Sequence, residues 1–260
     1  MQIIIIRACA VGDFVLGLPA LEALQEKHPT AHFTLIGYPS TLEIARDFIR
    51  VSAIHSIDVE PWRHLFHQPI SGLSFDQAIV WMKNPEVAKN LRASGIQDVL
   101  HAEPFPIQGH AATHLLNTLG LSWPSLPDRW KPDSDRIILH PGSGGPRKCW
   151  PHFRHLAERL TSPAFLLGPL ETAFDTGRHP RLTDLSLRQV AKALGSCRAF
   201  IGNDSGITHL AAHLGTPTIA LFGPTDPEVW GPIGRRVAVL KNPDLEAITI
   251  DDVLRQLEML

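Results

Sequence analysis

Cysteine is scarce in this sequence. The chain of 260 residues has 3 cysteines, Cys9, Cys149 and Cys197, which lie far apart and form no CxxC pair. A small, odd and scattered set excludes a disulfide framework and a cysteine-based zinc site, and it fits a reducing compartment. Because 44% of the residues are hydrophobic, the chain can instead bury a sizeable core, as one large domain or two ordinary ones.

An excess of charge of one sign is also lacking. The net charge is −2, and without a basic stripe or an acidic tail a nucleic-acid partner has little support. Hydrophobic runs are short, because Arg7 and Asp13 interrupt the apolar start, which lacks the basic region of a signal peptide. The stretch 206–225 has no charged residue, but Gly215 and Pro217 would break a membrane-spanning helix in its middle. We therefore expect a cytoplasmic protein with neither a signal peptide nor a membrane span.

What the sequence does contain is an alternation of strand and helix patterns. Strands are expected at 3–7, 33–36, 54–59, 77–81 and 98–101, and again at 136–140, 164–167, 199–202, 218–222 and 237–240. Helices are expected at 20–27, 42–49 and 86–93, and again at 153–160, 187–194, 208–213 and 251–258. This alternation predicts an α/β fold in which helices cover both faces of parallel sheets.

A segment without apolar periodicity separates the two halves. It reads "LSWPSLPDRWKPDSDR", residues 121–136, and its prolines and charges are typical of a linker. We place the boundary near 128–134, which gives domains at 1–128 and 134–260. Two doubly wound domains are expected to form a cleft at the carboxyl ends of their strands, where ligands tend to bind.

The first polar junction follows the first expected strand, in "RACAVGDFVLGLPALEAL". The strand ends near Arg7, Gly12 is expected to make a turn, and Asp13 comes next. Pro19 fits the first turn of the following helix, where its missing N–H has no helical partner in any case. Two interpretations of Asp13 stay open: a carboxylate that caps the helix, or a general base at the mouth of the cleft.

The second junction is a glycine-rich loop, "ILHPGSGGPRKCWP". Ser143 and Gly144 lie in it, and Arg147 and Lys148 follow. Glycines let backbone N–H groups approach an anion, and a lysine adds a positive charge. The spacing matches neither the Walker pattern nor GxGxxG, which disfavours a nicotinamide-dependent enzyme. The alternative is an ordinary glycine turn with exposed basic residues.

The third junction is "FIGNDSGITHLAAHLGTP", residues 200–217. The start of a helix attracts phosphate through its unpaired N–H groups, so the amides near Ser205 and Gly206 are expected to bind one. Asp204 would repel a phosphate, and its carboxylate is expected to accept hydrogen bonds from sugar hydroxyls. Together these groups fit a ligand with a diphosphate and a sugar. The alternative is ordinary capping of the helix by Asn203 or Asp204.

Two histidines in the same helix have a spacing that can hold zinc. His209 and His213 are four residues apart, yet no glutamate follows His209 as in HExxH, and no third ligand is evident. We therefore expect neither a metal nor another cofactor. His209 lies one turn after Gly206, which places it within reach of a bound phosphate.

Three blocks of sequence resemble a known family. "IIIIRACAVGDFVLGLPALEALQEKHP", "LHPGSGGPRKCWP" and "GNDSGITHLAAHLGTPTIALFGPTDP" are similar, in order, to family 9 glycosyltransferases, the heptosyltransferases of lipopolysaccharide core assembly. The resemblance implies a GT-B fold, with two Rossmann-like domains and the active site between them. It also implies that the N-terminal domain binds the acceptor and the C-terminal domain the nucleotide-sugar donor, typically ADP-heptose, and that transfer inverts the anomeric centre.

The resemblance assigns roles to individual residues. Asp13 falls on the catalytic aspartate of the family, Lys148 on its phosphate-contacting lysine, and Ser143 near a hydroxyl residue of the same loop. The donor-binding motif of the family falls on Asp204, Ser205, Gly206 and His209. These roles agree with physical chemistry, because inversion needs a base for the attacking hydroxyl, and a cation with aligned amides can stabilise the departing ADP without a metal.

The chain departs from the family in length. Only residues 61–74 join the third and fourth expected strands, so the acceptor domain is reduced, and the usual lipid-linked acceptor and the exact sugar stay open. Trp62, Phe66 and Phe75 near this segment form either core or a patch that faces the acceptor or the inner membrane. Two other functions also stay open: a GT-B-type sugar-nucleotide epimerase or hydrolase, and a non-catalytic nucleotide-sugar-binding protein, which the presence of Asp13 disfavours.

Overall fold

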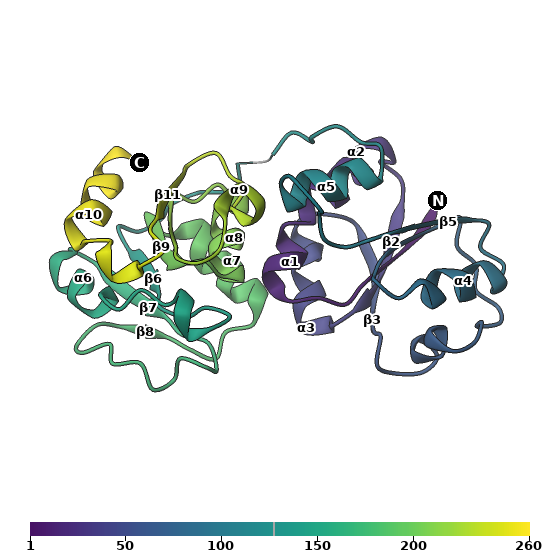
Figure 1. The fold of residues 1–260 in the computed structure, drawn as a ribbon, viewed down its shortest axis with the longest axis horizontal. Coiled ribbons are helices and arrows are strands. Elements are labelled where there is room, and N and C mark those ends of the chain that lie inside the picture. Colours follow the sequence, from purple (N-terminus) through teal and green to yellow (C-terminus); the bar gives the residue numbers. More distant parts are fainter. Residues whose placement is uncertain (127) are drawn as a thin grey trace. The chain divides into compact units, whose positions relative to one another are not determined.

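The protein folds into two compact units. The computed structural model describes residues 1–126 and 128–260, and it divides the chain into Met1–Pro124 and Ser125–Leu260. Each unit contains one β-sheet with helices packed against it (Figure 1). Among the described residues, no helix is both long and apolar enough to cross a lipid bilayer.

The first unit is built on a five-stranded parallel sheet in the order β3–β2–β1–β4–β5. The chain adds β2 and β3 on one side of β1 and then crosses over to add β4 and β5 on the other, so the strand order reverses between β1 and β4. The strands are β1 Gln2–Arg7, β2 His32–Gly37, β3 Val51–Ser56, β4 Gln77–Trp81 and β5 Asp98–Ala102. The helices are α1 Val11–Val15, α2 Leu18–Lys27, α3 Pro39–Leu42, α4 Pro85–Ala93 and α5 Ala111–Thr118, with 3₁₀ turns η1 Glu43–Asp47 and η2 Trp62–Phe66.

The sequence explains why β1 is central. Its four consecutive isoleucines, residues 3–6, are at most 1% exposed, as in parallel strands that are buried on both faces. In the same unit Trp62 is only 8% exposed, and Phe66 and Phe75 pack against the same hydrophobic cluster. These three aromatic side chains therefore belong to the core and do not form an exposed patch.

The second unit is built on a six-stranded parallel sheet in the order β11–β10–β9–β6–β7–β8. Here the strand order reverses between β6 and β9. The strands are β6 Ile137–His140, β7 Pro163–Leu166, β8 Arg181–Leu182, β9 Ala199–Asn203, β10 Thr218–Phe222 and β11 Val237–Lys241. The helices are α6 Phe153–Arg159, α7 Leu187–Ser196, α8 Gly206–Leu214, α9 Pro227–Trp230 and α10 Ile250–Met259, with 3₁₀ turns η3 Pro146–Lys148 and η4 Leu245–Ala247.

Both sheets are parallel and doubly wound, so the predicted α/β fold class is confirmed. The division into units falls after Pro124, a few residues before the boundary predicted near 128–134. The reason is that much of the proline-rich segment is bound to the second unit. The backbone N–H of Arg129 donates to Leu214 O at 3.0 Å, and that of Lys131 donates to Gly195 O at 2.8 Å.

Several local predictions differ from the structure. The strand expected at 54–59 lies at Val51–Ser56, and the helix expected at 42–49 is divided between α3 and η1. Gly12 does not make a turn but lies inside the short helix α1. The elements α1, α5, β8 and α9 were not predicted, and neither were the 3₁₀ turns η2, η3 and η4.

Candidate functional site

Two of the three polar junctions meet at the strand-order reversal of the second sheet. The glycine-rich loop leaves the carboxyl end of β6, and residues 203–206 follow β9, which pairs directly with β6. Ligands of doubly wound sheets bind outside the carboxyl ends of the strands at such a reversal. The topology therefore brings together Ser143, Gly144, Lys148, Asp204, Ser205, Gly206 and His209.

Asn203 ties the two junctions to each other. Its side chain is 0% exposed, and its Nδ2 donates to Pro141 O at 2.7 Å while its Oδ1 accepts from the backbone N–H of Trp150 at 2.9 Å. Trp150 is itself buried, and its Nε1 donates to Ile248 O at 2.9 Å. Both ends of the glycine-rich loop are thus fixed to the end of β9.

Removing the Asn203 side chain should lower the stability of the second unit. Asn203→Ala leaves Trp150 N–H and Pro141 C=O buried without their partner, and we expect the free energy of unfolding to fall by about 1–3 kcal/mol. Chemical denaturation of the variant and the wild type measures the difference. Asn117→Ala, at an exposed position of α5, is the control and should change stability by less than about 0.5 kcal/mol. Equal effects of the two substitutions would contradict the role of Asn203.

Lys148 and Asp204 form an ion pair at the centre of this region. Lys148 Nζ donates to Asp204 Oδ2 at 2.7 Å, and the hydroxyl of Thr225 donates to the same oxygen at 2.6 Å. His209 Nε2 lies 3.8 Å from the other carboxylate oxygen, Oδ1. The Asp204 side chain is 7% exposed and that of Lys148 32%, so a partly exposed cation is held by a buried anion.

The start of α8 is organised by hydroxyl groups. Ser205 is the N-cap residue and accepts from the backbone N–H of Thr208 at 3.4 Å, so the alternative of capping by Asn203 or Asp204 was wrong. Ser143 Oγ donates to the backbone carbonyl of Asp204 at 2.8 Å. Gly206 is the first residue of the helix, where amides have no helical acceptor by position. The arrangement keeps the amide end of α8 beside the glycine-rich loop.

A carboxylate that the sequence analysis missed lies against the glycine-rich loop. A Cβ at Gly142 would collide with the carboxyl group of Glu171, whereas a Cβ at Gly144 or Gly145 would meet no described atom within 4 Å. Glu171 Oε2 accepts from the backbone N–H of Gly168 at 2.9 Å. A side chain at position 142 would therefore need Glu171 to move, whereas Gly144 and Gly145, in the second part of the loop, have open space beside them.

Cys149 follows η3 at the end of the glycine-rich loop, and its thiol donates to Gly145 O at 3.6 Å. Burial raises the pKa of its thiol above the ordinary value, and the negative charge of Glu171 raises it further. Since the thiolate is the nucleophilic form of cysteine, this position does not favour nucleophilic catalysis by Cys149.

The histidine pair of α8 lies in the interior. His209 is 5% exposed and His213 is 4% exposed. Within residues 1–126 and 128–260, no group of three or more His, Cys, Asp or Glu side chains is placed to hold a metal ion. His209 contacts the candidate site through its Nε2, which lies 3.8 Å from Asp204 Oδ1.

Asp13 belongs to the first unit. It lies in the first turn of α1, which follows β1 at the strand-order reversal of that sheet. The N-cap of α1 is Ala10 and that of α2 is Gly17, so Asp13 is the N-cap residue of neither helix. Its backbone carbonyl accepts a hydrogen bond from Arg7 Nη2 at 2.8 Å.

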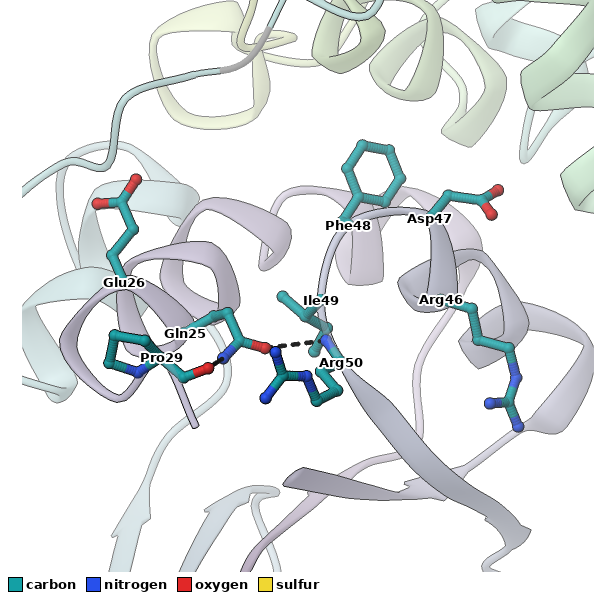
Figure 2. Close-up of a pocket in the computed structure, with 8 residues that line it drawn as sticks. All are labelled: Gln25, Glu26, Pro29, Arg46, Asp47, Phe48, Ile49 and Arg50. Carbon is teal, nitrogen blue, oxygen red and sulfur yellow. Dashed lines mark hydrogen bonds between the residues drawn. The ribbon is translucent and has the colours of Figure 1, made fainter. Parts of the chain in front are cut away.

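A surface hollow elsewhere in the first unit contains none of the predicted site residues. It has a volume of about 480 Å³ and lies between the end of α2 and the segment before β3, with Gln25 Oε1 accepting from Arg50 N at 2.9 Å (Figure 2). Its elements lie at the amino ends of the strands, the edge opposite to the one where ligands of such sheets bind. The residues around it are Gln25, Glu26, Pro29, Arg46, Asp47, Phe48, Ile49 and Arg50.

The chain is similar to known glycosyltransferases in sequence and in fold. Residues 53–253 match the family "Glycosyltransferase family 9 (heptosyltransferase)". Lipopolysaccharide heptosyltransferase 1 of Pseudomonas aeruginosa is 25% identical over 90% of this chain and 82% of its own length. The structure of Escherichia coli ADP-heptose lipopolysaccharide heptosyltransferase II superimposes with a TM-score of 0.80 at 19% identity, covering 100% of this chain and 98% of that one. E. coli heptosyltransferase WaaC with ADP gives a TM-score of 0.76 at 20% identity, covering 100% and 99%.

Proposed function

The chain belongs to glycosyltransferase family 9, and from its site we propose that it transfers a heptose, or a related sugar, from ADP-heptose to a glycan acceptor of the lipopolysaccharide core type with inversion. One observation carries the proposal: Lys148, fixed by buried Asp204, lies beside the amide end of α8 at the strand-order reversal of the second sheet. A structure of a similar enzyme with ADP supports this choice of nucleotide.

The second unit is proposed to bind the donor. Its diphosphate lies between Lys148 and the amides of Ser205 and Gly206, where a cation and the positive end of the α8 dipole act together. Glu171 closes the other end of the glycine-rich loop with a negative charge, which suits hydroxyl groups rather than phosphate. The charges thus orient the donor along the loop.

Asp204 is proposed to have two roles. Its Oδ2 already accepts from Lys148 and Thr225, and this fixes the position of the lysine ammonium. A carboxylate can accept about four hydrogen bonds, so Oδ1 retains capacity for a sugar hydroxyl. Ser143 Oγ donates to the backbone carbonyl of Asp204 at 2.8 Å, and His209 Nε2 lies 3.8 Å from Asp204 Oδ1. Both residues thus help to hold Asp204 in place.

The chemical step is proposed to use Asp13 as the base. The acceptor hydroxyl gives its proton to the Asp13 carboxylate while its oxygen forms a bond to the anomeric carbon. The bond between that carbon and the phosphate oxygen breaks, and its electron pair leaves with ADP. Lys148 and the α8 amides stabilise the negative charge that develops. The first unit thus supplies the acceptor side, and a lipid-carried acceptor would bring the enzyme to the surface of the inner membrane.

Nucleotide binding and product analysis test the proposal. ADP at 100 times its dissociation constant should add about 2.7 kcal/mol of stability, whereas adenosine at the same concentration, lacking the phosphate contacts, should add much less. Purified enzyme should consume ADP-heptose only when an acceptor glycan is present. ADP release at the same rate without acceptor would indicate a hydrolase or an epimerase, and binding without turnover on any acceptor would indicate a non-catalytic binder.

A further inference from the structure

Arg7 is a buried cation beside the candidate base. It is the last residue of β1 and only 3% exposed. Two of its nitrogens donate hydrogen bonds to the segment that carries Asp13: Nη2 to the backbone carbonyl of Asp13 at 2.8 Å, and Nε to the Sγ of Cys9 at 3.3 Å. One guanidinium therefore connects the end of the strand with the first turn of α1.

Trp81 also interacts with the guanidinium. Its Cζ lies 5.5 Å from the centroid of the indole ring, within the range of a cation–π interaction. The indole is 1% exposed, and its Nε1 donates to the Thr118 hydroxyl at 2.9 Å, which fixes it to the end of α5. Arg7 and Trp81 end the neighbouring strands β1 and β4, where the order of the sheet reverses.

Stability alone does not explain a cation at this position. Burying a charge is costly unless every polar atom is satisfied, and an apolar side chain of similar volume is often as stable or more so. Arg7 Nη1 is buried and has no hydrogen-bond partner in the described part of the chain. Among the described residues, both side-chain hydrogen bonds of Arg7 end on residues 9–13, which points to a role in placing that segment.

The segment needs such support because α1 is short. It has five residues, and an isolated helix of this length is unstable in water. The helix ends at Val15, two residues after Asp13, so no further turn of α1 supplies an N–H to the Asp13 carbonyl. This carbonyl instead accepts a hydrogen bond from Arg7. Arg7 therefore holds the backbone of α1 at the residue that carries the candidate base.

We propose that Arg7 is a positioning residue that, through its contacts with Trp81 and the Asp13 carbonyl, aims the Asp13 carboxylate at the acceptor hydroxyl. This inference rests on the proposed function, because it assigns Arg7 to the reaction through Asp13. Arg7 itself does not contact the substrate. Its removal should lower kcat and leave the KM for the donor unchanged, since the donor-binding groups belong to the other unit.

A double-mutant cycle tests the inference. Arg7→Lys keeps the charge but cannot make both bonds, and we expect kcat for sugar transfer to fall about tenfold, since small misplacements of a reacting group cost 10–100-fold. In the Asp13→Asn background the same substitution should change the residual rate about twofold or less, because no base is left to misplace. Arg7→Met, which fills the space without a charge, is the second variant if Arg7→Lys melts near the assay temperature.

Arg236→Lys is the matched control. Arg236 lies over the Trp130 ring at 4.7 Å and bonds Gly215 O at 2.9 Å, in the other unit and away from the site residues. Its substitution should leave kcat unchanged. An equal loss from Arg7→Lys with and without Asp13, or no loss at all, would overturn the inference. If Asp13→Asn itself retained the wild-type rate, the base assignment of the proposed function would fail instead.

Discussion

Sugar transfer should fall about 10²–10⁴-fold when Asp13 is replaced by asparagine, the range that a general base contributes. Asparagine has the same size and cannot take a proton. Asp13 is not an N-cap residue, and its charge in the first turn of α1 contributes at most about 1 kcal/mol through the helix dipole, so the melting temperature should barely change. Initial rates with saturating ADP-heptose measure the effect, and ADP affinity is measured beside them.

Asp58→Asn is the control for this substitution, because Asp58 is an exposed carboxylate of a turn in the same unit. It should leave the rate and the ADP affinity unchanged. Near-wild-type transfer by Asp13→Asn would refute the base assignment. If Asp13→Asn also lost ADP affinity, the substitution would have damaged the structure. The loss of rate would then not support Asp13 as the base.

The central strands of the sheets could be predicted from the sequence, whereas the edge strands were predicted less accurately. The four isoleucines of β1 form a continuous apolar run, the pattern of a strand buried on both faces, and β1 was placed within one residue. At the edge, β3 is only partly buried, and its residues show no clear apolar period. Ile57 is buried just beyond the strand, and this drew the prediction toward 54–59.

Short elements that depend on tertiary contacts could not be predicted. Gly12 suggested a turn because glycine is typical of turns, yet the chain continues as α1, in which the backbone carbonyl of Asp13 accepts from Arg7 Nη2. The same limit affected the start of α8, where Asn203, Asp204 and Ser205 are all good capping residues. Tertiary packing decides among them, because β9 extends to Asn203 and uses its side chain inside the protein.

The sequence led us to propose which residues bind the donor, but it did not indicate how their side chains pair. Lys148 and Asp204 are 56 residues apart, and the sequence gives no sign that one side chain binds the other. Glu171 was missed because its loop carries no recognisable motif. Its only signal was Gly142, which we interpreted as open to an anion although the structure places the Glu171 carboxyl group against it.

Replacing Lys148 with alanine should weaken ADP binding roughly 10- to 150-fold, which corresponds to the 1.5–3 kcal/mol of a charge-assisted hydrogen bond. Adenosine, which has no phosphate, should lose much less affinity. The substitution acts in two ways, because it removes a cation and also leaves the buried Asp204 carboxylate without its partner near the phosphates. Calorimetric titration of both ligands into both proteins measures the difference.

A second substitution separates these two effects. In Lys148→Ala/Asp204→Asn no unpaired negative charge remains, so part of the lost ADP affinity should return, although the direct lysine contact is still missing. Lys192→Ala, an exposed lysine of α7 in the same unit, is the control and should bind ADP like the wild type. Equal losses for ADP and adenosine would refute a phosphate contact by Lys148. If Asp204→Asn restored nothing, the ion pair would serve only to position the lysine, and the repulsion between Asp204 and the diphosphate would be negligible.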